Sequence, residues 1–108
     1  MKQWEIYTFD FAAEGTHPAV IVSHPDRIAN AQTINVLLCS SHRVTRSPRK
    51  CEVLLDREDG LDWEAVVRCD IMYQINLIHL RQRRGEVTRF RRRAIVQRLN
   101  ACFGFNGV

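Results

Sequence analysis

The chain has 108 residues, enough for one small domain, and we expect residues 1–108 to form it. Its hydrophobic content of 45% is typical of a folded globular protein, and basic residues outnumber acidic ones to give a formal charge of +4. No apolar run is long enough to span a bilayer and the N-terminus lacks a signal-peptide pattern, so the sequence predicts a cytoplasmic protein with no membrane contact.

Six segments are predicted to be short β-strands because they alternate in polarity or are rich in β-branched and aromatic residues. In chain order they are residues 4–11, 18–23, 33–39, 51–55, 65–70 and 73–80. They are joined by a turn at Gly15, a break at residues 24–26, a polar basic loop at 40–50 and an acidic turn at 56–62.

The last part of the chain is predicted to be a helix. Thr88 can cap it, and one stripe at helical spacing contains Phe90, Ala94, Ile95, Leu99, Cys102 and Phe103. The predicted fold is therefore mainly β, a curled antiparallel barrel of about six short strands with a C-terminal α-helix.

The four cysteines show no metal-site spacing. Cys39, Cys51, Cys69 and Cys102 form no C-x-x-C pair, and the four histidines do not flank them. We expect reduced, mostly buried thiols, with no metal and no cofactor.

Basic residues are concentrated at the C-terminal end. Residues 81–108 hold eight arginines and one acid, about +7, whereas residues 1–80 carry about −3. The guanidinium fork matches phosphate oxygens well, so nucleic acid is a natural partner. The alternative is a solvated helix face.

Several motifs occur in a specific order along nearly the whole chain: Trp4-Glu5-Ile6-Tyr7, Gly15 to Ser23, Ile34 to Ser41, Gly60-Leu61 with Ala65-Val66-Val67-Arg68-Cys69-Asp70, then Leu80, Gly85 and the final helix. Together they resemble the PemK/MazF toxins, whose fold is the SH3-like CcdB/PemK barrel. The resemblance implies an endoribonuclease that cuts single-stranded RNA without metal, using the ribose 2′-hydroxyl as nucleophile. It also implies a homodimer and a cognate antitoxin that binds through an acidic segment.

Arg68 and Asp70 are the first candidates for the chemistry. Residues two apart on a strand share a face, so both can approach one phosphate while Cys69 points the other way. The resemblance assigns Asp70 as base and Arg68 as acid or charge stabiliser, and stabilisation suits arginine better because it holds its proton so strongly. The alternative from the residues alone is an ordinary ion pair at a strand end.

His17 and Ser40 are the other catalytic candidates. His17 stands where the resembling family has the arginine of its R-P motif, and Ser40 stands where it has a threonine. Histidine can donate a proton near neutral pH, so His17 can replace that arginine as acid, mark a weakened enzyme, or simply fill the turn before Pro18.

Five arginines are the candidates for RNA binding. Two lie in the basic loop and three precede the final helix: Arg43, Arg46, Arg81, Arg83 and Arg84. Three functions stay open at this stage. They are a toxin-type endoribonuclease, a CcdB-like poison that binds DNA gyrase without cutting, and an RNA-binding module that has lost catalysis.

Overall fold

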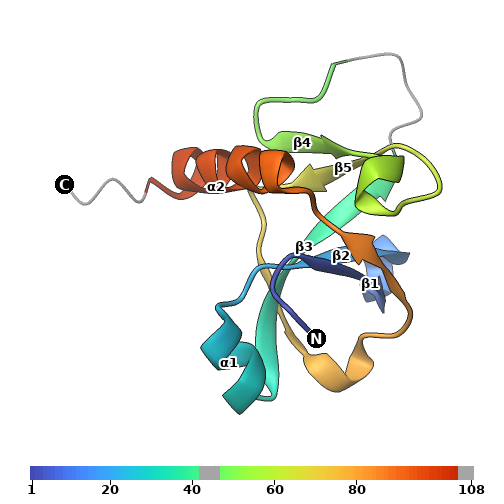
Figure 1. Ribbon diagram of the computed structural model, residues 1–108, viewed down its shortest axis with the longest axis vertical. Helices are drawn as coiled ribbons and strands as arrows, with labels where there is room; N and C mark the ends of the chain where they lie inside the picture. Colours follow the sequence, from blue (N-terminus) through green and yellow to red (C-terminus); the bar gives the residue numbers. More distant parts are fainter. Residues whose placement is uncertain (42–46, 105–108) are drawn as a thin grey trace.

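The computed structural model describes residues 1–41 and 47–104. Arg43 and Arg46, two of the arginines proposed to bind RNA, lie outside these residues. The described strands form one curled antiparallel sheet in the order β4-β5-β3-β2-β1-β7, and β6 pairs with the start of β3 (Figure 1). The prediction of a mainly β fold with a C-terminal helix is confirmed.

The strand boundaries follow the predicted segments closely. The strands are β1 Glu5–Asp10, β2 Thr16–Ile21, β3 Thr33–Ser41, β4 Glu52–Leu55, β5 Ala65–Arg68, β6 Tyr73–Asn76 and β7 Arg83–Glu86. The helices are α1 Pro25–Asn30 and α2 Arg89–Phe103, with 3-10 turns η1 Ala12–Glu14, η2 Arg57–Asp59 and η3 Leu77–His79.

Strand β7 is the seventh strand, one more than predicted. Its sequence is Arg-Arg-Gly-Glu, which offers no apolar alternation to recognise. It forms by pairing with β1, where Ile6 lies opposite Gly85. A side chain at Gly85 would lie 2.0 Å from the carbonyl oxygen of Asp59, so only glycine allows this close approach.

Two other local predictions are corrected. The break at residues 24–26 opens helix α1, because His24 Nδ1 accepts the Asp26 N–H at 3.1 Å and Pro25 occupies the first turn. The predicted sixth strand stops at Asn76, whose side chain accepts the N–H of Ile78 at 3.1 Å and so begins η3.

Helix α2 begins where predicted, but the interaction at its N-terminus differs from the predicted side-chain cap. The side chain of Thr88 makes no capping bond; instead its backbone N–H donates to Asp59 Oδ1 at 3.0 Å. The predicted apolar stripe holds for Ile95, which is fully buried, and fails for Phe90, which is 84% exposed. The stripe is therefore narrower than the sequence indicated.

The sheet has two differently filled faces. One face lies under α2, and its core includes Ile6, Leu37, Val67 and Ile95. The other face holds Ala19, Leu38 and a set of aromatic side chains that includes Phe11. Figure 1 shows α2 next to β4, with α1 at the opposite end of the molecule.

Candidate active site

Arg68 and Asp70 form a two-pronged ion pair at the end of β5. Arg68 Nε donates to Asp70 Oδ1 at 3.1 Å and Nη2 donates to Oδ2 at 2.9 Å. Both side chains are about a third exposed, whereas Cys69 between them is fully buried in the core under α2. The two charged groups thus lie together on the open side of the strand.

The ion pair fixes the charge state of both partners. The hydrogen bond from Arg68, offset in part by burial, lowers the pKa of Asp70 from its ordinary value. The same bond raises the pKa of Arg68. Asp70 is therefore ionised in the resting protein, and while Arg68 holds it, Asp70 is a weak proton acceptor.

His17 and Ser40 lie next to this pair. A pocket of about 70 Å³ is lined by residues of η1, four strands and the β5–β6 connection: Glu14, His17, Leu38, Ser40, Arg68, Ile71 and Tyr73. His17 Nε2 lies 2.7 Å from the carbonyl oxygen of Glu14, which orients its ring. Three of the four residues proposed for catalysis therefore share one pocket, and Asp70 is joined to it through Arg68.

Strand alternation explains why these residues converge. His17 is two residues before the buried Ala19, and Ser40 is two residues after the buried Leu38, so both continue the aromatic-side face. Ser40 pairs with Val66 in the β3–β5 register, and Arg68 is two residues beyond Val66. Since β2, β3 and β5 are neighbours, the three polar side chains lie in one row across the sheet.

Two residues at this pocket were not singled out from the sequence. Glu14 supplies a second carboxylate from η1, immediately before Gly15, which has a φ of +88°. Tyr73 opens β6, and its ring meets Phe11 edge to face at 4.9 Å. The sequence could have pointed to Glu14, because an acidic residue directly precedes the glycine of a tight turn. No local pattern in the sequence indicates that Tyr73 belongs to the pocket.

The three arginines before α2 have different surroundings. Arg83 Nε donates to Glu5 Oε2 at 2.6 Å. Arg84 lies 3.4 Å from Thr8 Oγ1 and packs over the ring of Trp63. Arg81 is exposed, and its guanidinium has no hydrogen-bond or ion-pair partner among residues 1–41 and 47–104. Arg81 is thus the most available of the three for phosphate or base.

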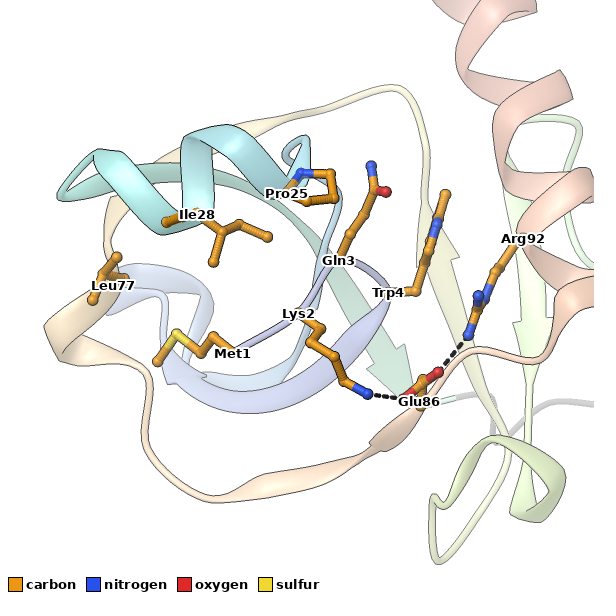
Figure 2. A pocket seen from close by; sticks show the side chains of 10 residues that line it. Met1, Lys2, Gln3, Trp4, Pro25, Ile28, Leu77, Glu86 and Arg92 are labelled. Atoms are coloured by element: carbon orange, nitrogen blue, oxygen red, sulfur yellow. Dashed lines mark hydrogen bonds and ion pairs between the residues drawn. The ribbon is translucent and has the colours of Figure 1, made fainter.

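A larger cavity lies elsewhere, beside the N-terminus. It has about 800 Å³ and includes Trp4 and Ile28, with Lys2 and Arg92 both paired to Glu86 at 3.8 and 2.5 Å (Figure 2). None of the proposed catalytic residues lines it. The candidate site is therefore chosen for the chemical groups gathered around Arg68 and not for the size of its cavity.

Two further findings concern metals and membranes. Across the described part of the chain, no cluster of three or more His, Cys, Asp and Glu side chains is arranged to hold a metal ion. None of the described helices is long and apolar enough to cross a membrane.

Solved structures described as toxins or as endoribonucleases share this fold. The toxin MazF-mt6 of Mycobacterium tuberculosis superposes with a TM-score of 0.81 at 19% identity, over 94% of this chain and 98% of that one. A mycobacterial endoribonuclease in complex with its cognate antitoxin gives 0.84 at 22%, over 97% and 96%. MazF in the MazE-MazF complex of Deinococcus radiodurans gives 0.75 at 18%, over 96% and 95%. At these identities the likeness shows the fold.

The family is shown by sequence. None of the curated proteins is similar enough in sequence to match the chain. The family model of PemK-like, MazF-like toxins, by contrast, matches residues 2–103, which is nearly the whole chain. The protein therefore belongs to the PemK-like, MazF-like toxins of type II toxin-antitoxin systems.

Proposed function

We propose that this toxin is an endoribonuclease that cleaves single-stranded RNA by attack of a ribose 2′-hydroxyl, without a metal ion. The observation that carries the proposal is the grouping of His17, Ser40 and Arg68 around one pocket, with Asp70 bound to Arg68. A structural relative described as an endoribonuclease supports the reaction class. A proton acceptor, a proton donor and a fixed cation are the parts this reaction needs.

The reaction is a transesterification at phosphorus. The 2′-hydroxyl gives its proton to Asp70, its oxygen forms a bond to phosphorus, and the bond from phosphorus to the 5′-oxygen breaks. His17 gives a proton to the departing 5′-oxygen. Arg68 neutralises the charge that develops on the phosphorane, and the Ser40 hydroxyl donates to one of its oxygens. The products are a 2′,3′-cyclic phosphate and a 5′-hydroxyl.

The resting ion pair gives this scheme a first step. An RNA phosphate that takes up the Arg68 guanidinium must displace the Asp70 carboxylate from it. Once released, Asp70 loses the hydrogen bond that lowers its pKa, and it becomes a better proton acceptor. Substrate binding would therefore activate the base. Glu14, the other carboxylate at the pocket, is the alternative base, and a Glu14→Gln variant that loses cleavage as fully as Asp70→Asn would favour it.

We also propose the partners expected of such a toxin. Structural relatives are described in complex with their antitoxins, and an acidic antitoxin segment would suit the arginines of this chain. We expect a cytosolic homodimer, since α2 leaves Phe90 and Val96 uncovered at 84% and 44% exposure. Sedimentation that shows only monomer at micromolar concentration would contradict the dimer.

One experiment separates the endoribonuclease from its alternatives. Purified protein is incubated with a long RNA in EDTA, and the RNA ends are analysed. Cyclic phosphates and 5′-hydroxyls support the proposal. RNA binding without cleavage would indicate a module that has lost catalysis. This alternative is favoured by His17, which stands where the family has an arginine. Neither binding nor cleavage would favour a protein-binding poison.

A further inference from the structure

A second pocket adjoins the candidate active site. It has a volume of about 400 Å³ and is lined by Phe9, Asp10, Ile78, His79 and Arg81. The lining comes from the end of β1, from η3 and from the residue after Leu80. The segment after η3 is joined to β1 here, because the N–H of Arg81 donates to the carbonyl oxygen of Thr8 at 3.0 Å. The proposed cleavage chemistry uses none of these side chains.

The pocket is one side chain away from His17. Phe9 lies opposite His17 in the β1–β2 register, and such cross-strand partners share a face with Cβ atoms about 4.5–5.5 Å apart. A row of rings also links the two pockets. Phe9 meets Phe11 at 4.7 Å, Phe11 meets Tyr73 at 4.9 Å, and Tyr73 lines the pocket of His17 and Arg68. A nucleotide next to the scissile phosphate would therefore reach both pockets.

The chemistry of the lining matches an unstacked nucleobase. Phe9 offers a ring and Ile78, 72% exposed, offers an uncovered aliphatic surface, which together can enclose the flat faces of a base. Arg81 and His79 can donate hydrogen bonds at its edge. Asp10 can accept with Oδ2, since its Oδ1 already accepts the Ala12 N–H at 2.9 Å.

The two pockets differ in volume, and each volume suits a different part of a nucleotide. The 70 Å³ pocket at Arg68 admits little more than the oxygens of a phosphate, because one water occupies about 30 Å³ in the liquid. The 400 Å³ pocket falls within the range of about 300–1,000 Å³ that is usual for small-molecule sites. Phosphate and base would therefore bind in different places.

We propose that the Phe9–Arg81 pocket binds the nucleobase of a nucleotide adjacent to the scissile phosphate and prefers guanine. Arginine donates to guanine O6 and N7, and a carboxylate can accept from guanine N1–H and N2–H. Adenine offers an amino group where guanine offers O6, and a pyrimidine covers less of the apolar lining. The inference rests on the proposed function, because it takes RNA as the substrate of the neighbouring site.

The test measures base binding without relying on cleavage. Isotope-labelled protein is titrated with each of the four nucleoside 5′-monophosphates and followed by NMR. We expect guanosine monophosphate to shift the amide signals of Phe9, Asp10, His79 and Arg81 and to bind about tenfold more tightly than the other three. Arg81→Gln should remove this preference. Arg93→Gln, at an exposed arginine on α2, is the matched control and should leave it unchanged.

The outcomes separate this inference from the proposed function. Equal shifts with all four nucleotides, shifts confined to α2, or no shifts would each overturn the base pocket, even if the protein cuts RNA. Guanine-selective shifts in a protein that cuts no RNA would support the base pocket and contradict the proposed endoribonuclease activity. In a cleaving protein, mapped cut sites should lose a guanine preference at one flanking position in Arg81→Gln and keep it in Arg93→Gln.

Discussion

Two arginine–aspartate clusters in this toxin have similar geometry and different surroundings. Arg91 of α2 reaches Asp56 at 2.7 and 3.0 Å and Asp59 at 2.6 Å, and the Asp59 side chain is fully buried. Arg68 reaches Asp70 at 2.9 and 3.1 Å, and both side chains remain about a third exposed. The first cluster joins α2 to η2; the second borders a pocket.

Burial decides what each cluster can do. Asp59 also accepts the N–H groups of Asp56 and Thr88, and its fully buried side chain is out of reach of an anion from solvent that could replace it on Arg91. Asp70 has no such enclosure, so an anion arriving from solvent can take its place on Arg68. The same kind of ion pair thus stabilises the fold where it is covered and can serve binding where it is open.

The largest effect should follow from breaking the buried cluster. Arg91→Gln would leave the Asp59 carboxylate buried without its cation, and we expect a loss of about 3–5 kcal/mol in the free energy of unfolding. Urea denaturation measures it. Arg68→Gln is the matched comparison and should cost about 1 kcal/mol or less because its pair is open to solvent. Equal losses in the two variants would contradict the comparison.

The buried cluster should also make stability depend on pH. The hydrogen bond from Arg91 lowers the pKa of Asp56 below its ordinary value of 3.8. A group whose pKa is lower in the folded state adds stability above the unfolded pKa and loses it as the pH falls through the folded one. The free energy of unfolding should therefore decrease as the pH is lowered to about 4 and beyond. This fall should be smaller in Arg91→Gln, and an identical fall would show that other groups cause it.

The next effect concerns the base at the open pair. Asp70→Asn keeps the size of the side chain but removes its proton acceptor, so we expect cleavage to drop by about a hundredfold or more. The fold should stay nearly unchanged because the side chain of Asp70 is open to solvent. The affinity for RNA should hold or rise, because the phosphate no longer has to displace a carboxylate from Arg68. Cleavage rate and RNA affinity are measured on the same preparation. An unchanged rate would remove Asp70 from the chemistry.

A smaller, pH-dependent effect should distinguish the roles of His17. If it supplies the proton to the leaving oxygen, activity should rise as Asp70 ionises, which happens below the usual carboxylate range, and should then fall as the imidazole loses the proton it must donate. His17→Arg should remove the falling limb, and His17→Ala should lose activity at every pH. A wild-type profile that is still level at pH 8, or a normal rate in His17→Ala, would leave His17 as a turn residue.

The smallest effect compares a free arginine with a paired one. Each phosphate contact on a single strand contributes about 0.7 to the slope of log affinity against log salt. Arg81→Gln should flatten the slope by about that amount if its free guanidinium contacts a phosphate, and should leave the slope unchanged if the guanidinium binds only the base edge. Arg83→Gln should leave the slope unchanged, because Arg83 is held by Glu5. Binding measured at several salt concentrations gives both slopes, and a reversed ranking would overturn this use of the arginines.

Strand alternation made most of the fold predictable. The pattern around Leu37, Leu38 and Cys39 predicts a strand buried on at least one face, and β3 is buried on both. Strand β7 escaped prediction because its pairing depends on contacts of Gly85 with β1 and with the turn at Asp59, far away in the sequence. Phe90 was wrongly predicted to be buried, because helical spacing shows which residues share a side of the helix but not how wide the buried part of that side is.

The candidate site was predictable to the extent that it is local. The two-residue spacing of Arg68 and Asp70 predicted their common face, and the strand-end positions of His17 and Ser40 followed from the resemblance. The contribution of Glu14 depends on how η1 folds back toward β3 and β5. Nor does a sequence tell a free arginine from a paired one, since the partner of Arg83 is 78 residues away.

The central claim is that the open Arg68–Asp70 pair serves RNA cleavage. Its most direct test compares the ends produced from one long RNA, in EDTA, by the wild type, Arg68→Gln and the control Arg93→Gln. We expect 2′,3′-cyclic phosphates from the wild type and the control at similar rates, and a rate about 10²–10³-fold lower from Arg68→Gln, as for loss of one transition-state charge stabiliser. Undiminished cleavage by a folded Arg68→Gln protein would contradict the account.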